Sequence, residues 1–170
     1  MSRPSWNRLT AWFIDWLCIL AWVGLTAAVG VPLYLSGVTA NLGTGPLNVI
    51  ATLVVVVPVT LALAKMEAGP REATVGKRLR GLRVVQSGSG FRASFRQTLL
   101  RNALKVTLPW SLGHWIAFEL SRSTGRSVAP WMWAATALAY VLPVIYVASL
   151  FRGRGITPYD RISHTVVVNS

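Results

Sequence analysis

The chain has 170 residues, of which 53% are hydrophobic and 13% are charged, with 17 lysines and arginines against 5 aspartates and glutamates. Soluble domains carry about 25% charged residues, so this composition excludes an ordinary soluble domain and indicates a membrane protein. The net charge of +12 suits contact with a nucleic acid or with an anionic lipid surface, and the placement of the basic residues decides between them.

The first apolar segment covers residues 10–35 and ends in a stretch rich in glycine that begins near Pro32. It exceeds the roughly 7 to 15 residues of a signal-peptide core, so we expect a retained membrane helix. Arg8 and Asp15 are seven residues apart, which is two helical turns, so they share one face of this helix. Asp15 would lie only about 6 Å into the apolar stretch, a depth at which a carboxylate still needs a partner, water or a proton.

Asp15 therefore has two interpretations. In the structural one, it pairs with Arg8 or Arg101 and fixes the first helix to its neighbours. In the functional one, it titrates on a route for protons or ions. The residue pattern leaves both open.

Three further apolar segments follow. Residues 47–65 and 130–151 have the roughly 17 to 25 residues that cross a bilayer. Residues 106–120 form a shorter segment that contains Pro109, so it predicts either a span or a re-entrant or surface helix. We expect four spans, because both termini and the basic segment between the second and third spans then lie on the cytoplasmic side.

The basic segment is the loop over residues 66–105, and the connection between the first two spans contains no lysine or arginine. The positive-inside rule therefore predicts a cytoplasmic loop and a cytoplasmic tail over residues 152–170. The cations of the loop alternate with leucine and valine, and the loop lies between two spans. Attraction to anionic lipid therefore explains these cations, and we expect no nucleic-acid partner. Cations expected at the membrane surface or facing lipid are Lys77, Arg78, Arg80, Arg83, Arg96 and Lys105.

Local signals predict structure inside this loop. Residues 79–91 combine a β-branched run with a Gly-Ser turn, which indicates a short strand or hairpin, and Val166–Val168 is a candidate partner for Leu82–Val85. Ser94 and Gln97 have capping-box spacing. They open an amphipathic helix whose apolar face would lie at the interface with anionic lipid.

A family resemblance rests on an ordered set of motifs. Arg8, Ala11 and Asp15 form R-x2-A-x3-D, followed by "TVGKRLRGLRVV" at 74–85, Arg101, and "TPYDRISHTVVV" at 157–168. The set resembles the RDD family of small polytopic prokaryotic membrane proteins. The resemblance implies a single domain over residues 6–168 in the prokaryotic plasma membrane, an association with transport, and monovalent cation/proton exchange in some members. It also implies a functional polar cluster of Arg8, Asp15, Asp160 and Arg101.

Asp160 also has two interpretations. It follows Pro158 and could cap the next turn, or it could join the polar cluster that the resemblance implies. His114 and His164 lie in different segments without carboxylates at ligand spacing, so we expect no metal and no other cofactor.

The expected fold class is an all-α integral membrane protein of about four transmembrane helices, with a basic cytoplasmic loop that contains an amphipathic helix and a short β element. Three functions compete: transport coupled to protons, a non-enzymatic assembly or accessory subunit, and an enzyme acting on lipid. The resemblance favours transport, and the absence of a catalytic motif disfavours an enzyme. Four short spans form a thin scaffold, so we expect a homo-oligomer or another membrane protein as partner.

Overall fold

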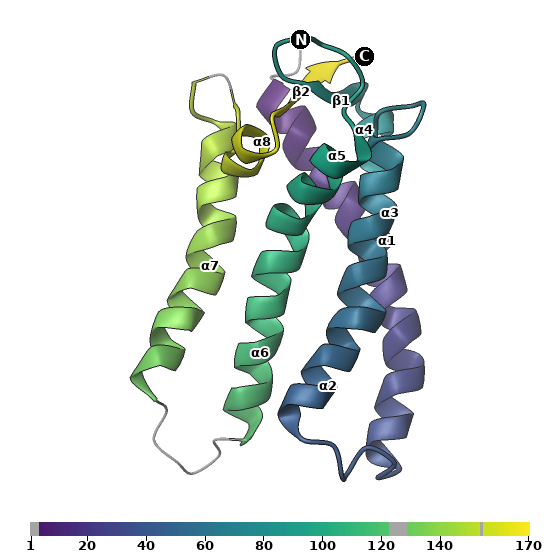
Figure 1. The fold of residues 1–170 in the computed structure, drawn as a ribbon, viewed down its shortest axis with the longest axis vertical. Coiled ribbons are helices and arrows are strands. Elements are labelled where there is room, and N and C mark those ends of the chain that lie inside the picture. The colour runs from purple at the N-terminus through teal and green to yellow at the C-terminus, as the bar shows by residue number, and fades with distance from the viewer. Residues whose placement is uncertain (1–3, 123–128, 154) are drawn as a thin grey trace.

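The computed structural model describes residues 4–122, 129–153 and 155–170. Long helical rods run beside one another, and short elements cover one end of them (Figure 1). The start of the first helix and the end of the last strand lie at this covered end. Most of the described chain is helical, as expected.

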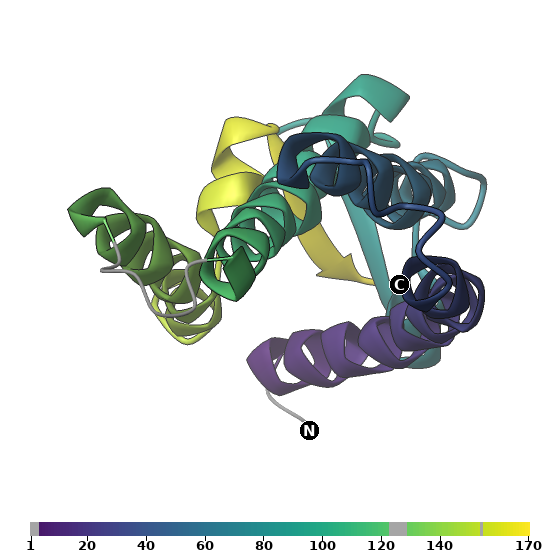
Figure 2. The same cartoon turned by 90° about the horizontal axis from the view of Figure 1, so that it is seen from below.

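Helix α1 (Pro4–Leu35) forms the first rod. The second rod joins α2 (Thr44–Ala51), the π-helix η1 (Thr52–Val56) and α3 (Val57–Glu67). The third joins α5 (Phe95–Asn102), the π-helix η2 (Ala103–Thr107) and α6 (Leu108–Arg122), and the fourth is α7 (Pro130–Leu150). Seen from below, α6 lies between α7 and the second rod, while α1 is inclined to the others (Figure 2).

Three helical segments of the described chain are long and apolar enough to cross a membrane: Ser5–Leu35, Gly45–Glu67 and Pro130–Leu150. The protein is therefore a membrane protein with three candidate spans. The expected span at 106–120 corresponds mostly to α6, whose 15 residues do not meet the same length.

Each π-helical segment ends two residues before a proline, Pro58 or Pro109. A proline donates no backbone hydrogen bond and its ring crowds the preceding turn, and a wider turn relieves that crowding. In each segment a carbonyl oxygen accepts a side-chain donor from another rod instead. Val54 O accepts from Trp22 Nε1 at 3.3 Å, and Leu104 O accepts from Tyr146 Oη at 3.0 Å. These bonds join α1 to the second rod and α7 to the third.

The covered end consists of α4 (Val75–Leu79), β1 (Leu82–Gln86), α5, α8 (Pro158–Ile162) and β2 (Thr165–Asn169), which we call the head. Strands β1 and β2 pair antiparallel, with Leu82 opposite Asn169 and Gln86 opposite Thr165. This confirms the predicted pairing of Val166–Val168 with the Leu82–Val85 segment. The sheet closes the head by joining the middle of the chain to its last residues.

Helix α5 begins at the predicted capping box. Gln97 N donates to Ser94 Oγ at 3.3 Å, and Ser94 N donates to Gln97 Oε1 at 3.0 Å. The residues that α5 buries are Thr98, Arg101 and Asn102, so its polar side faces the protein. The apolar side chain of Phe95 is exposed and is therefore available to the membrane interface. The polar side is buried because carboxylates from two other elements lie beneath it.

Candidate functional site

The head contains a group of buried charged side chains. One of them is Asp160 on α8, whose side chain is fully buried. Arg8 Nη2 lies 2.6 Å from Asp160 Oδ2, and Arg101 Nε lies 2.9 Å from Asp160 Oδ1. Since Arg8 belongs to α1 and Arg101 to α5, this one carboxylate joins three elements. The structure thus brings together three of the four residues of the predicted polar cluster.

Asp160 also caps its own helix. Thr157 N donates to Asp160 Oδ2 at 3.2 Å, and Asp160 N donates to Thr157 Oγ1 at 3.4 Å, which is a capping box. Both interpretations of Asp160 are therefore correct: the same carboxylate orders the turn of α8 and pairs with the two arginines. The cap holds the carboxylate in the position where the arginines reach it.

Glu67, at the end of α3, is the second buried carboxylate, and it belongs to none of the motifs in the sequence. Arg101 Nη1 donates to Glu67 Oε1 at 2.9 Å, and Asn102 Nδ2 donates to Glu67 Oε2 at 2.8 Å. Lys77 Nζ also donates to Glu67 Oε1. The signal that could have identified it is a single carboxylate at the end of an apolar span, where an unpaired charge is costly.

These contacts form a continuous ion-pair chain that runs Arg8, Asp160, Arg101, Glu67, Lys77. Arg101 is its centre, since its guanidinium binds both carboxylates and lies 5.3 Å from the centre of the Tyr159 ring. Burial alone would lower the pKa of Arg101, but Glu67 and Asp160 outweigh it and raise that pKa. Arg101 therefore stays charged and holds the chain together.

Asp15 does not pair with Arg8 or Arg101, the partners considered in its structural interpretation. Asp15 is buried, and its oxygens accept hydrogen bonds from Thr74 Oγ1 at 2.7 Å and from Gly76 N at 2.8 Å. Both donors are neutral and belong to the start of α4. Arg8 donates instead to Asp160 on α8, whereas α4 meets α1 at Ala11 and Asp15.

Helix α4 can reach Asp15 because it packs directly on the backbone of α1. A Cβ atom on Gly76 would lie 2.0 Å from the carbonyl oxygen of Ala11, so only glycine fits there. Ala11 is itself almost fully buried at this contact. The small residue in the R-x2-A-x3-D motif therefore lies where the two helices approach most closely.

This packing overturns the expectation that Lys77 faces lipid. Lys77 follows Gly76, is 6% exposed, and turns inward to Glu67. Burial lowers the pKa of Lys77 to about 8, although Glu67 opposes the shift. Lys105 is partly buried and lines a cavity. The other cations expected at the surface are exposed: Arg78, Arg80, Arg83 and Arg96.

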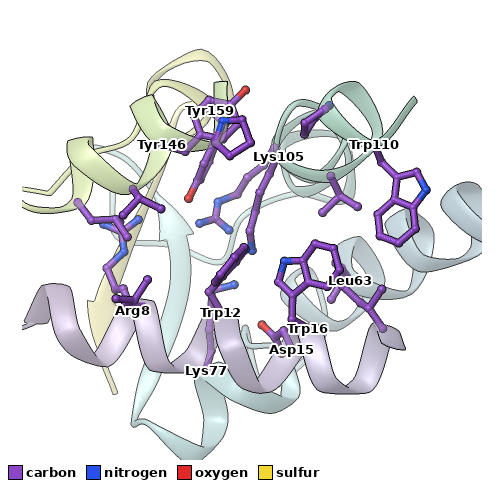
Figure 3. A pocket seen from close by; sticks show the side chains of 18 of the residues that line it. Arg8, Trp12, Asp15, Trp16, Leu63, Lys77, Lys105, Trp110, Tyr146 and Tyr159 are labelled. Atoms are coloured by element: carbon purple, nitrogen blue, oxygen red, sulfur yellow. The ribbon is translucent and has the colours of Figure 1, made fainter. Parts of the chain in front are cut away.

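The cavity has a volume of about 340 Å³ and lies between α1, α3, η2, α6, α7 and α8 (Figure 3). Its polar end is lined by Arg8, Asp15, Lys77, Arg101 and Lys105. Its apolar end is lined by Trp12, Trp16, Ile19, Leu63, Val106 and Trp110. Within the described residues, neither Asp15 nor Lys105 makes an ion pair, so a carboxylate and an ammonium group border the same space without a charged partner.

Comparison with known families decides the relationship that the motifs suggest. The model of the RDD family matches residues 3–164, nearly the whole chain. The chain belongs to the RDD family. Searches among curated proteins and among solved structures found no match. In this RDD protein, the arginine and two aspartates implied by the resemblance occupy two adjoining places: Arg8 and Asp160 are paired in the ion-pair chain, and Asp15 is bound by α4.

The stability of this RDD protein should depend on pH through Asp160. Burial alone would raise the pKa of Asp160, but Arg101 and Arg8 outweigh it and hold that pKa below the ordinary 3.8. A carboxylate with a lowered folded-state pKa stabilises the fold above its unfolded pKa, and this contribution is lost as the pH falls further. We therefore expect the stability gap between wild type and Asp160→Asn to be constant from pH 7 to about 5 and to narrow below about 4, by up to about 1.4 kcal/mol per pH unit. Unfolding curves in detergent micelles measure the gap, and an unchanged gap at pH 3 would contradict the assignment.

Proposed function

We propose that this RDD protein is transport-associated and that the cavity between α1, η2, α6 and α7 is its ligand site. The observation that carries the proposal is the pair of Asp15 and Lys105, which line one cavity among apolar helices without an ion-pair partner in the described chain. Unpaired charges inside a membrane domain are costly and commonly mark the path of a substrate or ion. The protein acts without catalysing a covalent reaction in this proposal.

The membrane arrangement that goes with this proposal has four spans. The third rod, formed by α5, η2 and α6, runs beside α7, which supports α6 as the additional span (Figure 1). The head carries exposed cations such as Arg78, Arg80 and Arg96, so the positive-inside rule assigns the head and both termini to the cytoplasm. The membrane is then the prokaryotic plasma membrane.

The specific activity proposed is movement of a monovalent cation coupled to a proton, with Asp15 as the group that exchanges the proton. Asp160 and Glu67 each bind two cations, so protonating either one would break ion pairs. Among the residues that the structure describes, Asp15 accepts hydrogen bonds from Thr74 and Gly76 alone, and its protonation would leave the ion-pair chain intact. It also lines the cavity, where a solute can reach it.

Flux in proteoliposomes tests this activity. We expect proton-coupled Na⁺ or K⁺ flux from the wild type and at least about a tenfold reduction in Asp15→Asn, which can accept the Gly76 bond but carries no charge. Glu72→Gln is a matched control, because Glu72 pairs with Arg83 in the head away from the cavity lining and should keep wild-type flux. Correctly inserted wild type without flux would exclude autonomous transport.

The second candidate is a non-enzymatic assembly or accessory subunit, which the saturated ion-pair chain favours. Every cation in that chain binds a carboxylate, as expected of a structural centre. A homo-oligomer or another membrane protein would then dock on the bundle or the head. This candidate predicts that Asp15→Asn lowers the amount of protein or abolishes co-purification of a partner, while wild type and variant both show no flux.

A further inference from the structure

We propose that the cavity binds the headgroup of an anionic phospholipid, with the Lys105 ammonium group as its principal contact. The inference rests on the proposed function in treating this cavity as a ligand site, and it adds a lipid at Lys105 to the cation and proton assigned to Asp15. It differs from general attraction of lipid to the exposed cations of the head, since it assigns one site lined by named residues.

The charged residues of the cavity and of the ion-pair chain together carry a net positive charge, which favours an anionic ligand. The group formed by the ion-pair chain and the two cavity charges has an excess of cations: Arg8, Lys77, Arg101 and Lys105 against Asp15, Glu67 and Asp160. The lysine and two arginines of the ion-pair chain are held by Glu67 and Asp160. The Lys105 side chain makes no hydrogen bond or ion pair within the described residues, so its Nζ is free to bind a ligand.

The geometry of η2 directs Lys105 into the cavity. Arg101 and Lys105 are four residues apart in one continuous helix and therefore lie on the same side. Figure 3 shows the Lys105 side chain extending between Trp12 and the tyrosines Tyr146 and Tyr159. A phosphate bound in this cavity would contact the Lys105 ammonium group, and Arg8 and Arg101 line the same cavity. The phosphate charge would offset the energetic cost of an isolated cation among apolar groups.

The rest of the cavity suits the apolar part of a lipid. The lining of α1 extends from Arg8 to Ile19, about 16 Å along the helix. This distance leads from Arg8 past Trp12, Asp15 and Trp16 to Ile19, so the lining beyond Asp15 is apolar. A free inorganic anion would gain nothing from these apolar walls, whereas a lipid has a charged end and an apolar end in the same order.

The cavity also has the size and position for such a ligand. Ligand sites commonly measure about 300–1,000 Å³, so 340 Å³ holds a headgroup and the first part of its acyl chains. The cavity is bordered by α1 and α7, both candidate spans that expose large apolar side chains such as Leu17 and Val144. The remaining acyl chains can therefore lie along these helices, and the lipid can enter from within the bilayer.

Native mass spectrometry of the protein in an uncharged detergent tests the proposal, with phosphatidylglycerol and phosphatidylcholine of identical chains as probes. We expect the wild type to bind phosphatidylglycerol about tenfold more tightly than phosphatidylcholine, and Lys105→Gln to lose most of that preference. Lys105→Arg should retain it. The exposed cation Arg96 is the matched control, and Arg96→Gln should change the preference less than about twofold.

A second variant separates lipid binding from folding. Ala139 lines the cavity on α7, so Ala139→Phe should fill the space and reduce phosphatidylglycerol binding while keeping every charge. Equal binding of both lipids by the wild type, or full preference in a folded Lys105→Gln protein, would overturn the proposal. Displacement of phosphatidylglycerol by equimolar inorganic phosphate would also overturn it in favour of a soluble anion. Flux with no lipid preference would refute this inference alone, and lipid preference with no flux would refute the transport proposal alone.

Discussion

Glu67→Gln should lower the free energy of unfolding by about 3–5 kcal/mol, the usual cost of removing one partner from a buried ion pair. Glutamine keeps the size of the side chain and can still accept from Asn102, so the change removes mainly the negative charge. Lys77 would then make no ion pair within the described chain, and Arg101 would keep only Asp160. Both cations are almost fully buried, so water replaces the lost carboxylate poorly.

Glu72→Gln is the matched comparison. It removes the same charge from the Arg83 pair, whose atoms are 3.4 Å apart and whose arginine side chain is 47% exposed. Exposed pairs contribute about 0–1 kcal/mol, so this variant should unfold almost as the wild type does. Denaturant unfolding in mixed micelles gives both values, and similar losses for the two variants would show that the buried chain does not stabilise the head.

Gly76→Ala should destabilise the protein by about 3 kcal/mol, at the upper end of the cost of overpacking a well-packed core. The added methyl group would lie 2.0 Å from the carbonyl oxygen of Ala11. Because that atom belongs to the backbone of α1, no side-chain rotation relieves the collision, and α4 has to move away. The movement would lengthen the hydrogen bond from Gly76 N to Asp15 and withdraw Lys77 from Glu67.

Gly24→Ala is the control for this change, since a Cβ at Gly24 has no neighbouring atom within 4 Å and alanine is the better helix former. It should leave the thermal midpoint unchanged or slightly higher. Ala11→Gly should not rescue Gly76→Ala, because it removes a side chain and not the carbonyl group that collides. Rescue, or a midpoint for Gly76→Ala within 1–2 °C of the wild type, would contradict the close approach of α4 to α1.

Features that depend on local patterns could be predicted from the residues alone. Apolar segments of sufficient length predicted the membrane helices, because a helix in lipid satisfies its backbone bonds internally and needs only length and hydropathy. The capping box at Ser94 and Gln97 and the pairing of the valines of β2 with β1 were also predictable. Each depends on residue type at short spacing or on β-branched composition. The motifs around Arg8, Asp15 and Asp160 were sufficient to indicate the family.

Which charges meet depends on how the helices pack and could not be predicted from spacing. The spacing of Arg8 and Asp15 correctly places them on one face of α1, but other elements compete for each side chain, and α8 takes Arg8 while α4 takes Asp15. Lys77 and Glu67 are separated by a turn that carries no periodic signal, so their pairing follows from the contact of Gly76 with Ala11. A buried charge selects its partner by position in three dimensions, and this position depends on packing between helices that one-dimensional spacing does not encode.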